Sequence, residues 1–151
     1  MKYFAYSQRE FVYKYVVMAS DLDQFGHMSF ANYLRLMFLA SDALFLSTPN
    51  QQLRKTVRLK AIRTGMQFKH QTGYGDEILV KVSSSGLGQN NFSLLYTYVI
   101  EGDAQLVGLG RQEFELSATT RDSKKVKTPS SVQALLEPIQ VDERFLVYRY
   151  K

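Results

Sequence analysis

The sequence predicts an α+β domain in which a curved antiparallel sheet wraps around one long, apolar helix. Two observations predict this class of fold. One strongly apolar helical pattern begins at Phe30. One strand-like pattern precedes this helix, and a series of strand-like patterns follows it. Because a single helix is inserted after the first strand of an otherwise antiparallel series, the sheet can curl around that helix.

The first strand is expected over residues 9–18. Its aromatic and apolar residues Phe11, Tyr13, Tyr15 and Val17 alternate with Val12, Lys14 and Val16. This alternation indicates a strand with one face more buried than the other.

The turn that follows the strand is the most polar part of the chain. It holds Asp21 and Asp23, then Gly26 and His27, directly before the helix. Free backbone N–H groups and the positive end of the helix dipole gather at a helix N-terminus, where negative charge is stabilised. A carboxylate beside such an oxyanion site favours hydrolytic chemistry. Asp, Gly and Ser are also ordinary loop and capping residues, so spacing alone leaves both interpretations open.

The helix is expected to start after Ser29, a good N-cap. Apolar residues recur at helical spacing at Phe30, Tyr33, Leu34, Met37, Phe38, Leu44 and Phe45, and Leu36, Leu39, Ala43 and Leu46 lie off that stripe. A helix that is apolar nearly all round is expected to be enclosed by other elements.

The helix is predicted to end at Ser47-Thr48-Pro49-Asn50, followed by a loop or short helix over residues 51–60. Four strands are then expected, over residues 62–71 with an irregularity at Thr64-Gly65, and over residues 76–85, 91–101 and 104–119. Gly102-Asp103 is short enough for a tight hairpin. Residues 121–151 form a C-terminal extension, with a short helix through Leu136 and a possible strand over residues 142–150.

Composition limits the class of protein. A chain of 151 residues with 45% hydrophobic and 22% charged residues is expected to form one globular domain over residues 1–151. No apolar run is long enough to span a membrane, and the N-terminus shows no secretory signal, so a cytoplasmic protein is expected. Cysteine is absent and the only histidines are His27 and His70, so we expect neither a metal nor another cofactor.

The net charge of +5 indicates an anionic partner. Nucleic acid is one candidate, but the basic residues are scattered and no known nucleic-acid-binding module is visible, so it is not the expected partner. The phosphates of coenzyme A suit modest basicity equally well, and a merely solvated basic surface also accounts for it.

The string Asp21-x-Asp23-x-x-Gly26-His27-Met28-Ser29-Phe30-x-x-Tyr33 resembles the D-x-D-x-x-G-H-V-N-N-x-x-Y signature of hot-dog-fold thioesterases related to 4-hydroxybenzoyl-CoA thioesterase. The resemblance extends over roughly residues 9–128. It implies a hot-dog fold, hydrolysis of an acyl-CoA or acyl-carrier-protein thioester, and a homodimer or homotetramer with the active site at the dimer interface.

The resemblance also implies roles for individual residues. Asp23 matches the catalytic carboxylate, acting as nucleophile or general base, and Phe30 matches the residue whose backbone N–H polarises the substrate carbonyl. Gly26 lets the loop pass close to the substrate, and His27 places the substrate or holds the loop. Asp21 is expected to order the loop by accepting N–H bonds.

Ser29, Tyr33 and Phe38 are candidate substrate-binding residues, although Tyr33 also suits the core. Two departures from the signature bear on this set. Ser29 and Phe30 replace two asparagines, so any side-chain hydrogen bonds of those asparagines are missing. Phe38 and Leu39 stand where relatives often have glutamates, which favours an uncharged acyl group or, equally well, a tighter core.

Three other functions stay open. A hot-dog protein that binds acyl groups without hydrolysing them is favoured by the missing asparagines. The fold also hosts dehydratases and hydratases, but their histidine-containing motifs are not seen around His27 or His70. A nucleic-acid-binding module comes last.

Overall fold

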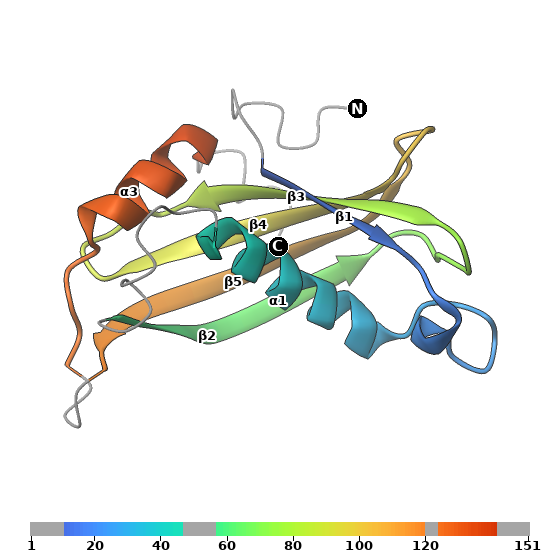
Figure 1. Cartoon of the computed structure of the whole chain (residues 1–151), viewed down its shortest axis with the longest axis horizontal. Helices are drawn as coiled ribbons and strands as arrows, with labels where there is room; N and C mark the ends of the chain where they lie inside the picture. Colours follow the sequence, from blue (N-terminus) through green and yellow to red (C-terminus); the bar gives the residue numbers. More distant parts are fainter. Residues whose placement is uncertain (1–10, 47–56, 120–123, 142–151) are drawn as a thin grey trace.

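The computed structural model describes residues 11–46, 57–119 and 124–141. Five strands form one antiparallel sheet in the order β1-β3-β4-β5-β2, and helix α1 packs on its inner face (Figure 1). The strands are β1 Phe11–Val16, β2 Val57–Phe68, β3 Glu77–Ser85, β4 Asn91–Ile100 and β5 Leu106–Ala118. The helices are the 3-10 turn η1 Ala19–Asp21, α1 Phe30–Leu46, α3 Ser130–Leu136 and the 3-10 turn η2 Glu137–Ile139.

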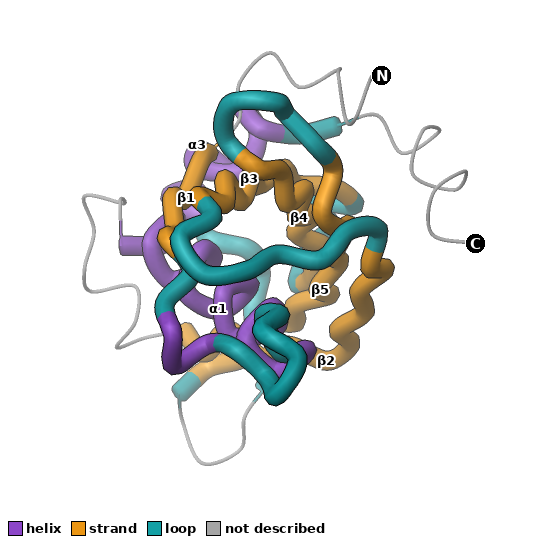
Figure 2. The backbone as a smooth tube through the Cα atoms, turned by 90° about the vertical axis from the view of Figure 1, so that its right-hand side faces the viewer, coloured by secondary structure: helices purple, strands orange, loops and turns teal. Residues whose placement is uncertain are grey.

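The sheet is curved, and α1 lies in its concavity. Seen end on, the strands follow an arc from β1 through β3, β4 and β5 to β2, with α1 on the inner side of that arc (Figure 2). The predicted class, one helix against a curved antiparallel sheet, is therefore confirmed, and α1 has 17 residues.

The strand predictions hold closely for β1, β3, β4 and β5, whereas β2 differs from the prediction in three ways. It begins at Val57, inside the segment predicted as a loop or short helix, and it ends at Phe68 rather than at residue 71. Its irregularity falls between Ala61 and Arg63 rather than at Thr64-Gly65. The extra residue of this bulge is Ile62, whose side chain is 49% exposed. One inserted residue reverses the alternation of faces, so Ile62 does not share the inner face of Met66 and Phe68.

Helix α1 is held against the sheet by its buried side. The residues Tyr33, Leu36, Met37, Ala40, Ser41, Leu44 and Phe45 are buried on it. Gly110 of β5 allows the helix to approach closely, because a Cβ atom at this position would lie 2.4 Å from the Cε of Met37. The absence of a side chain there makes room for the methionine.

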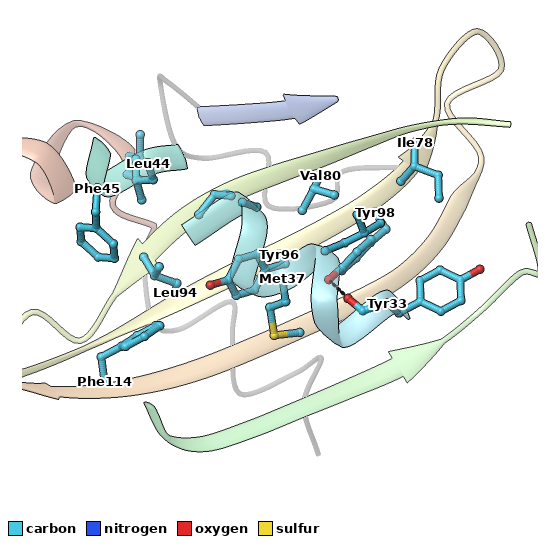
Figure 3. Packing of buried hydrophobic residues seen from close by; sticks show 14 of the residues in the cluster. Tyr33, Met37, Leu44, Phe45, Ile78, Val80, Leu94, Tyr96, Tyr98 and Phe114 are labelled. Carbon is cyan, nitrogen blue, oxygen red and sulfur yellow. Dashed lines mark hydrogen bonds between the residues drawn. The ribbon is translucent and has the colours of Figure 1, made fainter. Parts of the chain in front are cut away.

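Aromatic rings pack at both ends of α1 (Figure 3). Towards its C-terminus, the Phe45 ring contacts the rings of Phe92 and Phe114, with centroids 6.0 and 6.3 Å away. Towards its N-terminus, the Tyr33 ring lies edge-on to Phe68 and Tyr98. These edge-to-face contacts add to the hydrophobic burial and fix the helix along its length.

The described residues do not enclose α1 completely, contrary to the sequence prediction. Phe30, Phe38 and Leu46 are 59%, 48% and 58% exposed. Phe38 therefore does not contribute to a tighter core in the described structure, one of the two interpretations left open for it. An apolar stripe of this helix faces outward and is available to a ligand or to another protein chain.

The predicted short helix of the C-terminal extension is confirmed as α3. Its residues Val132 and Leu136, with Ile139 of η2, join the main hydrophobic core, and the Leu136 carbonyl accepts a hydrogen bond of 2.6 Å from Ser84 Oγ. Helix α3 lies at the end of the sheet opposite to the loops that precede α1 and follow β2 (Figure 1). The predicted strand over residues 142–150 lies outside the described residues.

Within the described residues, no helix combines the length and the hydropathy needed to cross a bilayer.

Candidate active site at the N-terminus of α1

Asp21 organises the loop between β1 and α1. Its carboxylate is buried, and Oδ2 accepts hydrogen bonds from Tyr15 Oη at 2.7 Å and from Met18 N–H at 2.8 Å. Arg35 of α1 places a guanidinium nitrogen 3.6 Å from Oδ1. The Asp21 carboxylate therefore joins the strand, the loop and the helix, in agreement with the ordering role predicted for it.

The backbone of Asp21 also holds the start of the helix. Its carbonyl accepts hydrogen bonds from Ser29 N–H and from Asn32 Nδ2, each of 3.0 Å. Asn32 Nδ2 also donates to Ser29 Oγ at 2.9 Å. Ser29 directly precedes the helix as predicted, but its hydroxyl contacts the Asn32 side chain rather than a backbone N–H.

Asp23 lies at the exposed tip of the same loop. Its Oδ1 accepts hydrogen bonds from Phe25 N–H at 2.8 Å and from His27 N–H at 3.1 Å, and its own N–H donates to the His27 carbonyl at 2.7 Å. These contacts close a small turn, in which Gly26 takes a φ of 77°, a conformation that favours glycine. Both side-chain bonds use Oδ1, so Oδ2 is left for a further partner.

Phe30 is the first residue of α1. A residue at this position cannot donate its backbone N–H within the helix. The carbonyl of Ser29 accepts from the N–H groups of Asn32 and Tyr33, at 3.1 and 3.4 Å, which begins the helical ladder. The Phe30 N–H is therefore a donor at the positive end of the helix dipole.

One pocket of about 570 Å³ lies between this helix end and the end of β2. It is lined by Asp23, His27, Met28, Phe30, Tyr33, Phe68, Lys69, His70 and Gln71. The structure thus brings together four of the predicted residues, namely Asp23, His27, Phe30 and Tyr33. A carboxylate and a helix N-terminus share one cavity, as the sequence predicted.

Three other predicted residues do not line this pocket. Gly26 shapes the turn, and Ser29 faces Asn32. Phe38 lies two turns along α1 from Phe30, on the same side of the helix.

The opposite wall of the pocket was not found from the sequence. It is built by Phe68 at the end of β2 and by the next three residues, Lys69, His70 and Gln71. The N–H groups of Lys69 and His70 both donate to the Val107 carbonyl, at 2.8 and 3.1 Å. Two residues opposite one form a β-bulge, which redirects the side chains at the strand end.

Tyr33 forms the floor of the pocket and also belongs to the core. Its hydroxyl is 2.6 Å from Thr72 Oγ1, and its carbonyl accepts a hydrogen bond of 2.9 Å from Tyr98 Oη (Figure 3). Burial raises the pKa of Tyr33, partly offset by its hydrogen bonds with Thr72. Tyr33 therefore remains a neutral hydroxyl at physiological pH.

The pocket combines an apolar side and a polar side. The Phe68 ring lies 5.2 Å from the rings of Phe30 and Tyr33, which together provide an aromatic surface. Asp23, Lys69 and the two histidines provide charge and hydrogen bonding. Among the described residues, no group of three or more His, Asp or Glu side chains is arranged to hold a metal ion. The arrangement suits an organic substrate with an apolar part and a carbonyl group.

Fold and site together define a hot-dog protein with a carboxylate beside the helix N-terminus. A sequence profile described as the thioesterase-like superfamily matches residues 17–136. The chain belongs to this superfamily. No curated protein sequence matches the chain at a significant level.

Solved structures show the same fold. The dynemicin thioesterase, described for induced-fit and allosteric effects upon polyene binding, is similar with a TM-score of 0.83 and 18% identity, covering 89% of this chain and 99% of that one. A 1,4-dihydroxy-2-naphthoyl-CoA thioesterase from Synechocystis has a TM-score of 0.77 and 20% identity, covering 85% and 96%. A Staphylococcus aureus protein solved in complex with CoA has a TM-score of 0.77 and 15% identity, covering 84% and 81%.

Proposed function

We propose that this protein is a thioesterase that hydrolyses an acyl-CoA or acyl-carrier-protein thioester to the free acid and the thiol. The observation that carries the proposal is that the Asp23 carboxylate and the first residue of α1, Phe30, line one pocket. Membership of the thioesterase-like superfamily supports the same reaction.

In the proposed reaction the thioester carbonyl lies between Asp23 and the helix N-terminus. Asp23 either attacks the carbonyl carbon or removes a proton from a water molecule that attacks it. Negative charge then develops on the carbonyl oxygen, and the Phe30 N–H donates to it with the help of the helix dipole. Collapse of the tetrahedral intermediate expels the thiolate. With Asp23 as nucleophile, a water molecule then hydrolyses the acyl-enzyme anhydride and releases the acid.

The remaining predicted residues act around these two groups. Gly26 keeps the loop turn open beside the substrate, and His27 lines the same wall as Asp23. Tyr33 packs beneath the acyl group, while Ser29 and Phe38 lie beside its path rather than in the pocket. Lys69 supplies positive charge for the phosphates of the carrier, and the His70 ring lies beside it in the pocket wall.

We also propose that the chain is a single domain that works as a homodimer or a homotetramer. Strand β2 is a sheet edge of 12 residues, and an unpaired edge is a template for pairing with another chain. Its last residue, Phe68, lines the pocket. A second copy bound along β2 would therefore adjoin the site.

A second candidate function is the binding of acyl groups without hydrolysis. It is favoured by Ser29 and Phe30, which replace the two asparagines of the family signature, and by Asp23 Oδ1, which already accepts two backbone N–H groups. In this alternative Asp23 only closes its own turn.

The test is release of free thiol from acyl-CoAs of graded chain length, and from acyl carrier protein, by wild type and Asp23→Asn. Asn keeps an oxygen for the N–H groups of Phe25 and His27, so the loop is preserved while the charge is lost. We expect a loss of at least about a hundredfold in kcat.

Asp103→Asn is the matched control. Asp103 is an exposed aspartate whose Oδ1 accepts the Gln105 N–H at 3.0 Å in a comparable turn, and it does not line the pocket. Equal activity of Asp23→Asn and wild type would refute the role of Asp23. Tight binding without release of thiol would establish the second candidate.

A further inference from the structure

The side-chain amide of Gln112 is an unusual feature of the core beneath α1. Gln112 of β5 is completely buried, and its Oε1 accepts a hydrogen bond from Tyr96 Oη. Its Nε2 has no hydrogen-bond partner, within the part of the chain that the structure describes. A buried donor without an acceptor destabilises the fold, so an amide at this position calls for an explanation.

Gln112 belongs to the same sheet face as the pocket. Phe68, which lines the pocket, pairs with Gly108, Met66 pairs with Gly110, and Thr64 pairs with Gln112. Paired residues of neighbouring strands share a face. Four residues of strand separate the pocket wall from the amide, a path of roughly 13 Å.

The surface between the pocket and Gln112 is built of glycines covered by methionine side chains. A Cβ at Gly108 would lie 2.7 Å from the Cε of Met66, and one at Gly110 would lie 2.4 Å from the Cε of Met37. Figure 3 shows Met37 reaching from α1 towards the sheet beside Tyr96. Methionine side chains have three rotatable bonds and rearrange readily, so this path can open without movement of the backbone.

The exposed side of α1 continues the apolar surface of the pocket, because the Phe30 ring lies 5.2 Å from that of Phe68. Phe30, Leu34 and Phe38 lie four residues apart along the helix, and Phe30 and Phe38 are 59% and 48% exposed. On β2, Phe68 is 43% exposed, Met66 is partly exposed and Thr64 is exposed. An acyl chain leaving the pocket along these residues would be covered by apolar side chains until it reached the level of Thr64 and Gln112.

We propose that Gln112 is a specificity-determining residue of the acyl site, whose Nε2 donates a hydrogen bond to a hydroxyl or keto oxygen far along the acyl chain. The proposal rests on the proposed function for the identity of the ligand as an acyl thioester. It adds the substrate class, namely medium-chain acyl groups with an oxygen substituent near the distal end. Such a ligand satisfies the buried donor, whereas a plain alkyl chain leaves it unpaired.

The experiment compares octanoyl-, decanoyl- and dodecanoyl-CoA with their ω-hydroxy counterparts, in turnover and in equilibrium binding. Wild type is expected to favour the best ω-hydroxy compound over its plain partner by about tenfold in kcat/KM and in Kd. Gln112→Met, which keeps the length of the side chain, is expected to abolish this preference, so that the ratio of ω-hydroxy to plain compound falls to about one in both kcat/KM and Kd.

Gln67→Met is the control, because Gln67 pairs with Leu109 and so lies on the other sheet face. It is expected to keep the preference. If wild type shows equal kcat/KM and equal Kd for the plain and the ω-hydroxy compounds, the proposal is overturned, whether or not Gln112→Met folds. A preference that survives in folded Gln112→Met would overturn it as well. The measurement of equilibrium binding does not depend on catalysis. If the protein hydrolyses none of the compounds but binds ω-hydroxyacyl-CoA more tightly than the plain acyl-CoA, the proposed function is refuted and the role of Gln112 is supported.

Discussion

Replacing Asp21 with alanine tests whether this buried carboxylate holds the site together. The change removes the acceptor for Tyr15 Oη and Met18 N–H, at 2.7 and 2.8 Å, and it removes the ion-pair partner of Arg35. The Asp21 carbonyl, which accepts from Ser29 and Asn32, is unchanged in the variant. The effect therefore reports the carboxylate alone.

The magnitude follows from the exposure of each partner. A hydrogen bond to a charged acceptor contributes about 1.5–3 kcal/mol, and two that share one oxygen contribute less than their sum, so we expect a loss of about 3 kcal/mol. The Arg35 side chain is 52% exposed, so solvent screens its ion pair, which adds little to this loss. For a domain of this size the total corresponds to a fall in Tm of about 6–12 °C.

Thermal and urea unfolding of Asp21→Ala, Asp21→Asn and Arg35→Ala measure these terms separately. Asp21→Asn keeps one oxygen acceptor and is expected to lose about half as much stability as Asp21→Ala. Arg35→Ala is expected to lose less stability than either Asp21 variant. At temperatures below the Tm of Asp21→Ala, this variant should release thiol more slowly than wild type, because the loop that carries Asp23 is no longer held. A Tm of Asp21→Ala equal to that of wild type would refute the reasoning.

Three further predictions concern the same end of the molecule. Gly26→Ala is expected to cost about 1–2 kcal/mol in urea unfolding, because alanine at a φ of 77° is strained, and an unchanged midpoint would contradict this. Tyr33→Phe is expected to cost about 1 kcal/mol, and in a double-mutant cycle with Thr72→Val the two effects should not add, since both remove the 2.6 Å contact. Burial holds the pKa of Tyr33 and Tyr96 above 10.0, so the unfolded chain loses these protons first. The free energy of unfolding should therefore be constant as pH approaches 10 and fall as pH rises further, with a smaller fall in Tyr96→Phe.

The fold could be predicted from the sequence where the pattern is local. The helix was expected from Phe30, where α1 begins, and the strands expected over residues 76–85 and 91–101 are β3 and β4 within one residue at each end. β2 was placed too late because its bulge at Ile62 inserts a residue and reverses the alternation. A period-of-two pattern cannot be read continuously through such a point.

The candidate site, too, could be predicted only where its residues are close in the sequence. Asp23 and Phe30 are only seven residues apart, so the sequence places both at the start of the helix, and the roles predicted for them follow from the resemblance to the family signature. The wall formed by Phe68, Lys69 and His70 depends on β2 lying at the sheet edge beside β5, and no local pattern encodes the order of strands. The bulge opposite Val107 that redirects these side chains is likewise a tertiary feature.

The missing asparagines of the family signature weigh less against catalysis than the sequence suggested. Asn32, two residues beyond Phe30, donates from one amide nitrogen to both the Asp21 carbonyl and Ser29 Oγ, so a carboxamide still ties the loop to the helix. The loop that carries Asp23 is thus held from the helix side by Asn32 and Arg35 and from the strand side by Tyr15. The position of Asp23 relative to the Phe30 N–H depends on this framework and not on residues 29 and 30 having amide side chains. The two groups proposed to be catalytic can therefore keep their geometry in this sequence.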